Sequence, residues 1–67
     1  MKLYFENSHG QRRVIAEPQT EEEAVKEIYK FCEDRNFNIY YVRTWIEPTG
    51  LKAYDVGSWS EFFYLEQ

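Results

Sequence analysis

The sequence predicts a small α+β domain, with one antiparallel sheet and one helix packed on one face, in the order β-β-α-β-β-β. Three observations lead to this prediction: an alternating start, one segment with helical spacing, and a second half rich in aromatic and β-branched residues. At 67 residues the chain has room for a single domain, residues 1–67. Its five Phe, six Tyr and two Trp are more than a disordered chain carries.

The first two strands are expected to form a hairpin. Lys2–Glu6 alternates apolar and polar side chains, which predicts a half-buried strand. Asn7–Gln11 follows as a loop, in which Gly10 adopts a positive φ without steric cost, as a three-residue hairpin loop requires. A second strand is expected over Arg12–Ala16 and is ended by Pro18.

The strongest local pattern is a helix start. Thr20 and Glu23 have the spacing of a capping box, in which the Thr20 hydroxyl accepts from the Glu23 amide and the Glu23 carboxylate reaches back to the Thr20 amide. The helix is expected over Glu21–Arg35, with Asn36 as a left-handed residue after it. Its apolar side chains recur at helical spacing and are expected to form the core together with side chains of the first hairpin: Ala24, Val25, Ile28, Phe31 and Cys32 with Leu3, Phe5 and Ile15.

The second half of the chain predicts three strands. Asn38–Glu47 is rich in β-branched and aromatic residues, which favours a strand over a helix. Pro48–Gly50 is a hairpin loop, and a fourth strand follows it. After a turn at Gly57–Ser60, Glu61–Glu66 is the last strand. The strand order stays open, because the first hairpin could lie beside the third strand or beside the last.

The second hairpin has a definite expected register. If Glu47 faces Leu51, then Trp45 faces Ala53 and Arg43 faces Asp55, a cross-strand ion pair that fits a solvated face. One face of this hairpin suits the core: Tyr40, Val42, Ile46, Tyr54 and Val56. The other face carries Tyr41, Arg43, Trp45 and Asp55.

The residue content gives little support to catalysis or metal binding. His9, the one histidine, falls in a hairpin tip, where a general base or a metal ligand would lack partners. Cys32 falls on the apolar helix stripe, which predicts a buried structural thiol. The three glycines are isolated, so no phosphate-binding loop exists. We therefore expect a protein that is not an enzyme, with no cofactor and no metal.

Charge and hydropathy bear on partners and location. Eight Lys and Arg oppose twelve Asp and Glu, a net charge of -4, with no basic stripe that would follow a phosphate backbone. The acidic residues at the helix start are expected to be capping residues on a solvated face. No apolar run approaches the ~18 residues of a membrane span. The lone cysteine without a signal peptide favours a cytoplasmic protein.

Aromatic side chains on the helix-free face of the sheet are the most informative functional feature. This face is expected to display a candidate interaction surface of Tyr4, Val14, Tyr41, Trp45, Phe62 and Tyr64, around Ala53. A group of that size exceeds the apolar patch of most monomers, and Tyr and Trp are enriched at binding hot spots. The sequence therefore suggests a non-enzymatic protein–protein interaction module, including a homodimer through this face.

Two other functions remain open at this point. The protein could be an acidic inhibitor that occupies the nucleic-acid site of a host defence or replication protein. It could also bind single-stranded nucleic acid by stacking, although the basic groove that accompanies such stacking is missing.

Three segments carry a resemblance to a group of known proteins. Tyr54–Leu65 resembles the C-terminus of small uncharacterised proteins encoded by phages and prophages of Gram-positive bacteria. Met1–Asn7 and the helix start Glu21–Val25 are similar too. The resemblance implies an accessory protein of a mobile element, in the cytoplasm of a bacterial host, that binds a host or phage protein. It supplies no functional residue.

Overall fold

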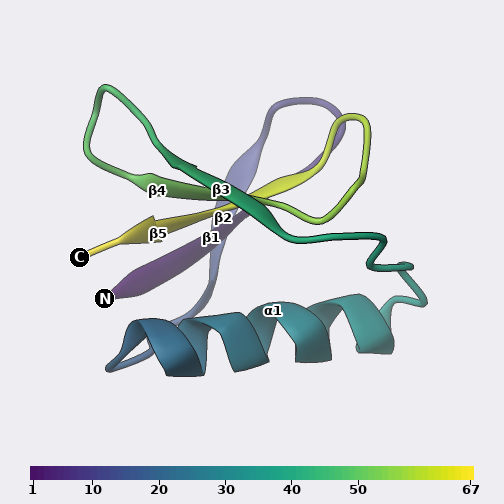
Figure 1. Ribbon diagram of the computed structural model, residues 1–67, viewed down its shortest axis with the longest axis horizontal. Helices are drawn as coiled ribbons and strands as arrows, with labels where there is room; N and C mark the ends of the chain where they lie inside the picture. Colours follow the sequence, from purple (N-terminus) through teal and green to yellow (C-terminus); the bar gives the residue numbers. More distant parts are fainter.

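The computed structural model describes residues 1–67 and contains six elements in the expected order. They are β1 (Lys2–Glu6), β2 (Arg12–Ala16), α1 (Glu21–Asp34), β3 (Arg43–Ile46), β4 (Lys52–Asp55) and β5 (Phe62–Glu66). All neighbouring strands are antiparallel, so the α+β class and the single antiparallel sheet are confirmed (Figure 1).

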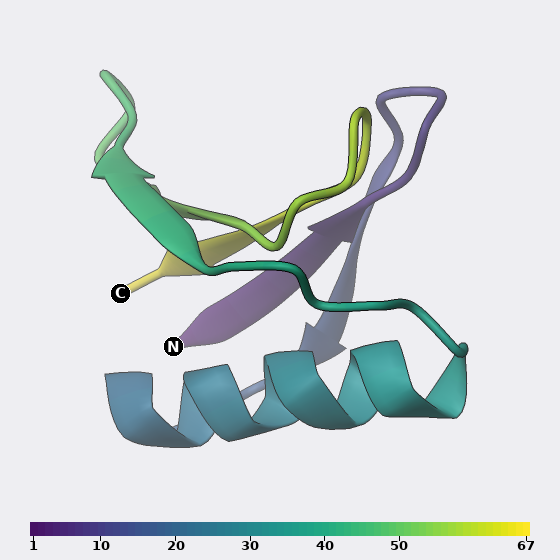
Figure 2. The same cartoon turned by 45° about the vertical axis from the view of Figure 1, so that its right-hand side comes forward.

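The strand order is β2-β1-β5-β4-β3, so the first hairpin lies beside the last strand. β1 and β5 pair along their whole length, with Leu3 opposite Leu65 and Phe5 opposite Phe63. β5 is therefore the one strand that joins the β1–β2 hairpin to the β3–β4 hairpin. The two chain termini lie side by side at one end of this central pair (Figures 1 and 2).

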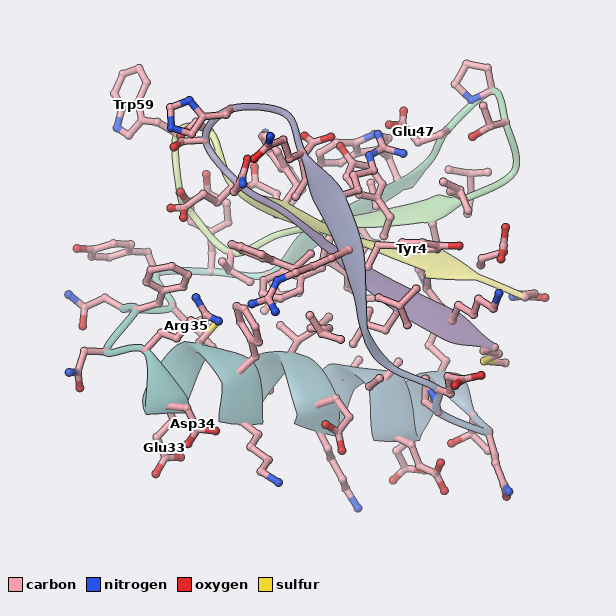
Figure 3. All side chains as sticks on the ribbon, turned by 180° about the vertical axis from the view of Figure 1, so that it is seen from behind. Tyr4, Glu33, Asp34, Arg35, Glu47 and Trp59 are labelled. Carbon is pink, nitrogen blue, oxygen red and sulfur yellow. The ribbon has the colours of Figure 1, made fainter.

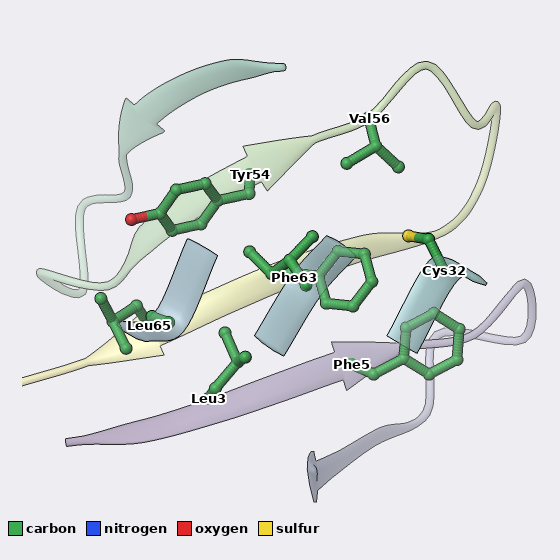
Figure 4. Close-up of a cluster of buried hydrophobic side chains, with 9 residues drawn as sticks. Leu3, Phe5, Cys32, Tyr54, Val56, Phe63 and Leu65 are labelled. Atoms are coloured by element: carbon green, nitrogen blue, oxygen red, sulfur yellow. The ribbon is translucent and has the colours of Figure 1, made fainter. Parts of the chain in front are cut away.

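Helix α1 runs along one side of the central strands (Figure 2), and the hydrophobic core is made of side chains from both. Nine buried residues form it, from α1, β1, β4, β5 and the residue that follows β4: Leu3, Phe5, Ala24, Ile28, Cys32, Tyr54, Val56, Phe63 and Leu65 (Figure 4). The Phe31 ring of α1 lies with its centroid 4.6 Å from that of Phe5 and 5.6 Å from that of Phe63. None of the nine residues comes from β3, which leaves that strand outside the core.

The start of α1 is capped as expected, with one difference. The Thr20 Oγ1 accepts a hydrogen bond from the Glu23 amide at 3.1 Å, as the capping box predicts. The Glu23 carboxylate, however, accepts from the amide of Gln19 at 2.8 Å instead of that of Thr20. The Glu23 carboxylate therefore still accepts a hydrogen bond from a backbone amide that precedes the helix, one residue before the amide that the capping box predicts.

The end of α1 is a two-bond cap. The helix ends at Asp34, one residue before the expected end, and Asn36 has a φ of 56°, as predicted. The Asn36 amide donates to the Glu33 carbonyl at 3.2 Å, and the Phe37 amide donates to the Cys32 carbonyl at 2.8 Å. These are the two bonds of a Schellman motif, which turns the chain back toward the sheet.

The two hairpin loops share one geometry. The Asn7 amide donates to the Gln11 carbonyl at 2.9 Å, and Gly10 has a φ of 77°. The Glu47 amide donates to the Leu51 carbonyl at 2.8 Å, and Gly50 has a φ of 93°. The register of the second hairpin is also confirmed, with Trp45 opposite Ala53 and Arg43 opposite Asp55.

The third strand is shorter and more exposed than expected. β3 begins at Arg43, and the preceding residues 38–42 keep one backbone hydrogen bond, from the Tyr40 amide to the Val56 carbonyl at 3.1 Å. Tyr54 and Val56 are buried as predicted, but the core positions predicted for Tyr40, Val42 and Ile46 are wrong. Ile46 is 66% exposed because β3 is an edge strand that α1 does not cover. Tyr40 lies in the segment before β3 and is 73% exposed.

Candidate functional site

One half of the helix-free face is covered by charged side chains. Tyr64, predicted to be displayed there, is only 5% exposed, which corrects that prediction. The Arg12 guanidinium lies 3.9 Å above the Tyr64 ring, and its Nε contacts the Glu6 carboxylate at 2.8 Å. Burial, and then the charge of Glu6, raise the pKa of Tyr64 above its ordinary value. Nearby, the Tyr4 hydroxyl donates to Glu66 at 3.2 Å.

The other half of this face contains a shallow groove of about 480 Å³. We call it the aromatic groove; its side chains are Tyr41, Arg43, Trp45, Asp55, Ser58, Trp59 and Phe62. The Trp45 and Phe62 rings pack edge to face with centroids 6.2 Å apart, and they form the floor. Trp59 is 99% exposed at the rim.

The structure divides the predicted interaction surface into two groups. Three of its six residues line the aromatic groove, namely Tyr41, Trp45 and Phe62. The other three, Tyr4, Val14 and Tyr64, lie on or beside the pair β1–β5, outside the groove. The continuous aromatic face that the sequence suggested is thus interrupted by the Arg12–Glu6 pair.

Asp55 fixes the polar part of the aromatic groove. Its Oδ2 accepts from Arg43 Nη2 at 2.8 Å, so the predicted ion pair is present. The expected solvated setting is only half right, because Asp55 is buried while Arg43 is exposed. The second carboxylate oxygen accepts from the Gly57 amide at 2.9 Å. Both oxygens of Asp55 therefore hold neighbouring groups in place.

Trp59 stands at the tip of the Gly57–Ser60 turn, on the side of the sheet away from α1 (Figure 3). Gly57 has a φ of 97°, and a Cβ there would lie 3.0 Å from the Cβ of Tyr40, so the turn requires glycine. The Ser58 hydroxyl donates to Glu61 at 3.0 Å and closes the turn. These contacts hold the turn while the indole of Trp59 makes no packing contact that buries it.

The same turn separates the aromatic groove from a second hollow of about 330 Å³. Apolar side chains that line this hollow include Phe37, Tyr40 and Phe63, and Trp59 borders both spaces. Sequence reasoning did not select Trp59. The available signal was its position between two serines in a glycine turn, outside any alternating strand, where no core position can receive it.

The acidic start of α1 is partly neutralised within the molecule. Glu21 forms an ion pair with Lys52 and accepts a hydrogen bond from the Tyr54 hydroxyl at 2.6 Å. Lys52, and then Tyr54, lower the pKa of Glu21 below its ordinary value. Further along the helix, Lys26 and Lys30 stand among the remaining carboxylates.

The remaining reactive side chains are placed as expected. His9 lies exposed at the tip of the first hairpin. Cys32 is fully buried, and this burial raises the pKa of its thiol. No three His, Cys, Asp or Glu side chains come together as a metal-binding group. Helix α1 is too short and too charged to cross a lipid bilayer.

Comparisons with protein-family models, with curated proteins and with solved structures gave no match. The geometry of the aromatic groove is therefore the basis on which a function is proposed.

Proposed function

We propose that the protein is a non-enzymatic protein-binding module and that the aromatic groove is its binding surface. The observation that carries this proposal is the 99% exposure of Trp59 in the same groove as the exposed side chain of Tyr41. An exposed tryptophan contributes little to the stability of a monomer, because it buries almost no apolar area. Trp, Tyr and Arg are also the side chains most enriched at binding hot spots, and the aromatic groove presents all three.

Several side chains of the aromatic groove are ordered before a partner binds. Trp45 and Phe62 are fixed by their mutual packing, and Arg43 is fixed by Asp55. Side chains that are already ordered lose little entropy on binding. An apolar side chain of the partner would lie over the floor, with Trp59 closing the contact from the rim. The guanidinium of Arg43 has N–H donors beyond those used by Asp55, which could bind a backbone carbonyl of the partner.

The alternatives have less support from the same side chains. Arg43 is the one cation of the aromatic groove and is already paired, whereas single-strand binding needs a basic path along the backbone. Asp55 is its one carboxylate, and both of its oxygens are engaged, which leaves no free acid or base. An acidic inhibitor would bind through free carboxylates, but three carboxylates of this chain already form ion pairs within the molecule.

The proposal fits an accessory protein that acts by binding, as the resemblance to phage and prophage proteins implies. That origin and a cytoplasmic location stay predictions, as does a dimer through the helix-free face.

The test is a binding comparison between Trp59→Ser and Tyr29→Ser. Both residues are exposed aromatics, but Tyr29 lies on α1, away from the aromatic groove. Proteins retained by the immobilised wild-type chain from an extract of its source cells would be identified, purified and titrated by calorimetry. We expect Trp59→Ser to weaken binding by about 30-fold or more, as for a hot-spot residue, and Tyr29→Ser to leave it unchanged.

Both variants should remain folded, because exposed substitutions usually change stability by less than ~0.5 kcal/mol. Circular dichroism checks this. If folded Trp59→Ser binds the purified partner as tightly as the wild type, the aromatic groove is not the binding surface.

A further inference from the structure

The sheet has two open edges, β2 and β3, and they differ in how they are protected. β2 carries the adjacent charges Arg12 and Arg13, its register shifts at a bulge opposite Leu3 and Tyr4, and Pro18 follows it closely. Charges, bulges and prolines are the features that keep edge strands from pairing with other chains. β3 keeps a regular register over its four residues and has one charged side chain, Arg43.

We propose that β3 is a self-pairing edge. Two copies of the chain join antiparallel through β3, so that two five-stranded sheets become one continuous sheet. This inference does not depend on partner binding in the aromatic groove, although it would bring the grooves of the two copies next to each other.

The backbone of β3 has hydrogen-bonding groups free for such a pairing. The Glu47 amide donates to the Leu51 carbonyl, so the backbone groups of Glu47 point toward the partner strand of its hairpin. In an antiparallel strand every second residue directs its backbone N–H and C=O groups to the same neighbour, so Trp45 also directs its backbone groups to β4. The N–H and C=O groups of Thr44 and Ile46 therefore point away from β4, toward the open side of the sheet. A second β3 strand offers the same two residues in the same orientation.

One register satisfies both the backbone and the side chains. With the two-fold axis at Trp45, Thr44 lies opposite Ile46 of the second copy, and the two residues exchange backbone hydrogen bonds. Arg43 then lies opposite Glu47 of the second copy, and this pair of opposite charges occurs twice. The Trp45 side chains of the two copies face each other. Opposite charges and aromatic pairs directly across antiparallel strands are both favourable.

The neighbouring registers lack this complementarity. Because only Thr44 and Ile46 have outward-facing groups within β3, the register can change only by two residues at a time. A shift of two in either direction separates Arg43 from Glu47 of the second copy. The charges of β3 and its hairpin loop therefore favour a second copy in one arrangement.

The pairing also covers the most exposed aliphatic side chain of the fold. Ile46 is 66% exposed, with no strand or helix over it. In the proposed register it packs beside Thr44 of the second copy. The contact is small, so we expect a weak dimer with a dissociation constant of about 10–500 µM.

The experiment compares two matched variants by sedimentation over a concentration range of ~10 µM to ~1 mM, in ~0.15 M salt to screen the net repulsion of two acidic chains. Ile46→Lys places a charge in β3, and Val14→Lys makes a similar change at an exposed position of the other edge, β2. We expect the wild type and Val14→Lys to form dimers as concentration rises, and Ile46→Lys to dimerise at least 10-fold more weakly. Circular dichroism establishes that both variants are folded.

A second measurement locates the contact. Amide hydrogen exchange of Thr44 and Ile46 should slow at high concentration in the wild type but not in Ile46→Lys. A wild type that stays monomeric over the whole range overturns the proposal, and so does an Ile46→Lys variant that dimerises as tightly as the wild type. A third result would also overturn the proposal. If the wild type is a monomer and Ile46→Lys removes its binding to another protein, then β3 pairs with a strand of that protein instead of a second copy.

Trp59→Ser keeps this test separate from that of the proposed function. Trp59 lies outside β3, so the variant should dimerise like the wild type even if it no longer binds a partner. Loss of the dimer in Trp59→Ser would show that the copies meet through the aromatic groove, which contradicts edge pairing.

Discussion

Tyr54 connects the core to the charged surface through a single hydroxyl group. Its ring is buried in β4, while its hydroxyl donates to Glu21 at the start of α1 at 2.6 Å. Lys52 binds the same carboxylate from the same strand. Burial, and then Glu21, raise the pKa of Tyr54, so the phenol remains protonated. The first turn of the helix is thereby attached to the sheet by two polar contacts.

This contact predicts part of the response of the protein to acid. The pKa of Glu21 is lower in the folded chain than in the unfolded one, so its charge stabilises the fold above the ordinary glutamate pKa of ~4.3. That contribution is lost as the pH falls through the lower, folded value. Lys52→Met removes the larger cause and Tyr54→Phe the smaller, so both variants should lose less stability than the wild type between pH ~6 and ~3.

Urea unfolding at several pH values measures this effect. At neutral pH, Tyr54→Phe should cost about 1 kcal/mol, the usual net value of a hydrogen bond. Lys26→Met, a similar change on α1 at a residue without an ion pair, is the control and should follow the wild type. Wild-type pH dependence in both Lys52→Met and Tyr54→Phe would contradict the role of Glu21.

Single positions were predictable where they depend on a short stretch of chain. Thr20, Gly10 and Gly50 each follow from turn or cap chemistry within about five residues. The Arg43–Asp55 pair follows from the hairpin register alone. The bond between Tyr54 and Glu21 was not predictable, because the residues are 33 positions apart and meet only through tertiary packing.

The C-terminal cap of α1 determines how the chain returns to the sheet. Asn36 adopts the left-handed conformation, and Phe37 then packs its ring near Phe31, with centroids 6.4 Å apart. We expect Asn36→Ala to destabilise the fold by about 1 kcal/mol, because Cβ is disfavoured at this φ, and Asn36→Gly to be neutral or stabilising.

Thermal and urea unfolding of both Asn36 variants test this expectation. Asn38→Ala, two residues later and without a positive φ, is the control and should change stability little. Equal stability of Asn36→Ala and Asn36→Gly would mean that the backbone conformation of residue 36 does not limit the cap.

Strand propensity located β3 but overestimated its length and burial. The run from Asn38 has the residue types of a strand, and those types favour a half-buried surface. Burial of Tyr40 and Ile46 would need a second layer beneath them, and α1 lies under the central strands instead. The candidate site was affected in the same way. The sequence placed Trp45 and Phe62 on the correct face but could not show that Arg12 covers Tyr64.

The whole molecule depends on one group of aromatic rings. Phe5, Phe31 and Phe63 come from β1, α1 and β5, and their rings contact one another. A domain of this length has a free energy of unfolding of roughly 3–10 kcal/mol. Phe63→Ala should cost about 3–5 kcal/mol and leave much of the chain unfolded at 37 °C.

Phe62→Ala is the matched control for this prediction, because Phe62 is the preceding residue on the opposite, half-covered face. It should lose less stability than Phe63→Ala when both are measured by circular dichroism and urea unfolding. A larger loss of stability in Phe62→Ala than in Phe63→Ala would mean that the main core lies on the face that carries Phe62, which contradicts the structure.

The strand order was beyond local reasoning, although β5 carried a partial signal. Residues Phe62–Leu65 have no charged side chain, which suits a strand with neighbours on both sides, whereas Arg12 and Arg13 suit an edge. The choice between the two strand orders that the sequence left open depends on the place at which the chain rejoins the sheet after α1. No pattern in the sequence gives that place.

The central position of β5 has a consequence for synthesis of the protein. The β1–β2 and β3–β4 hairpins both precede residues 62–66 in the chain, yet no strand of one pairs with a strand of the other except through β5. An isolated hairpin is marginally stable at best. The five-stranded sheet therefore cannot be completed until the last strand is inserted between them, and until then the edges of β1 and β4 that pair with β5 stay open.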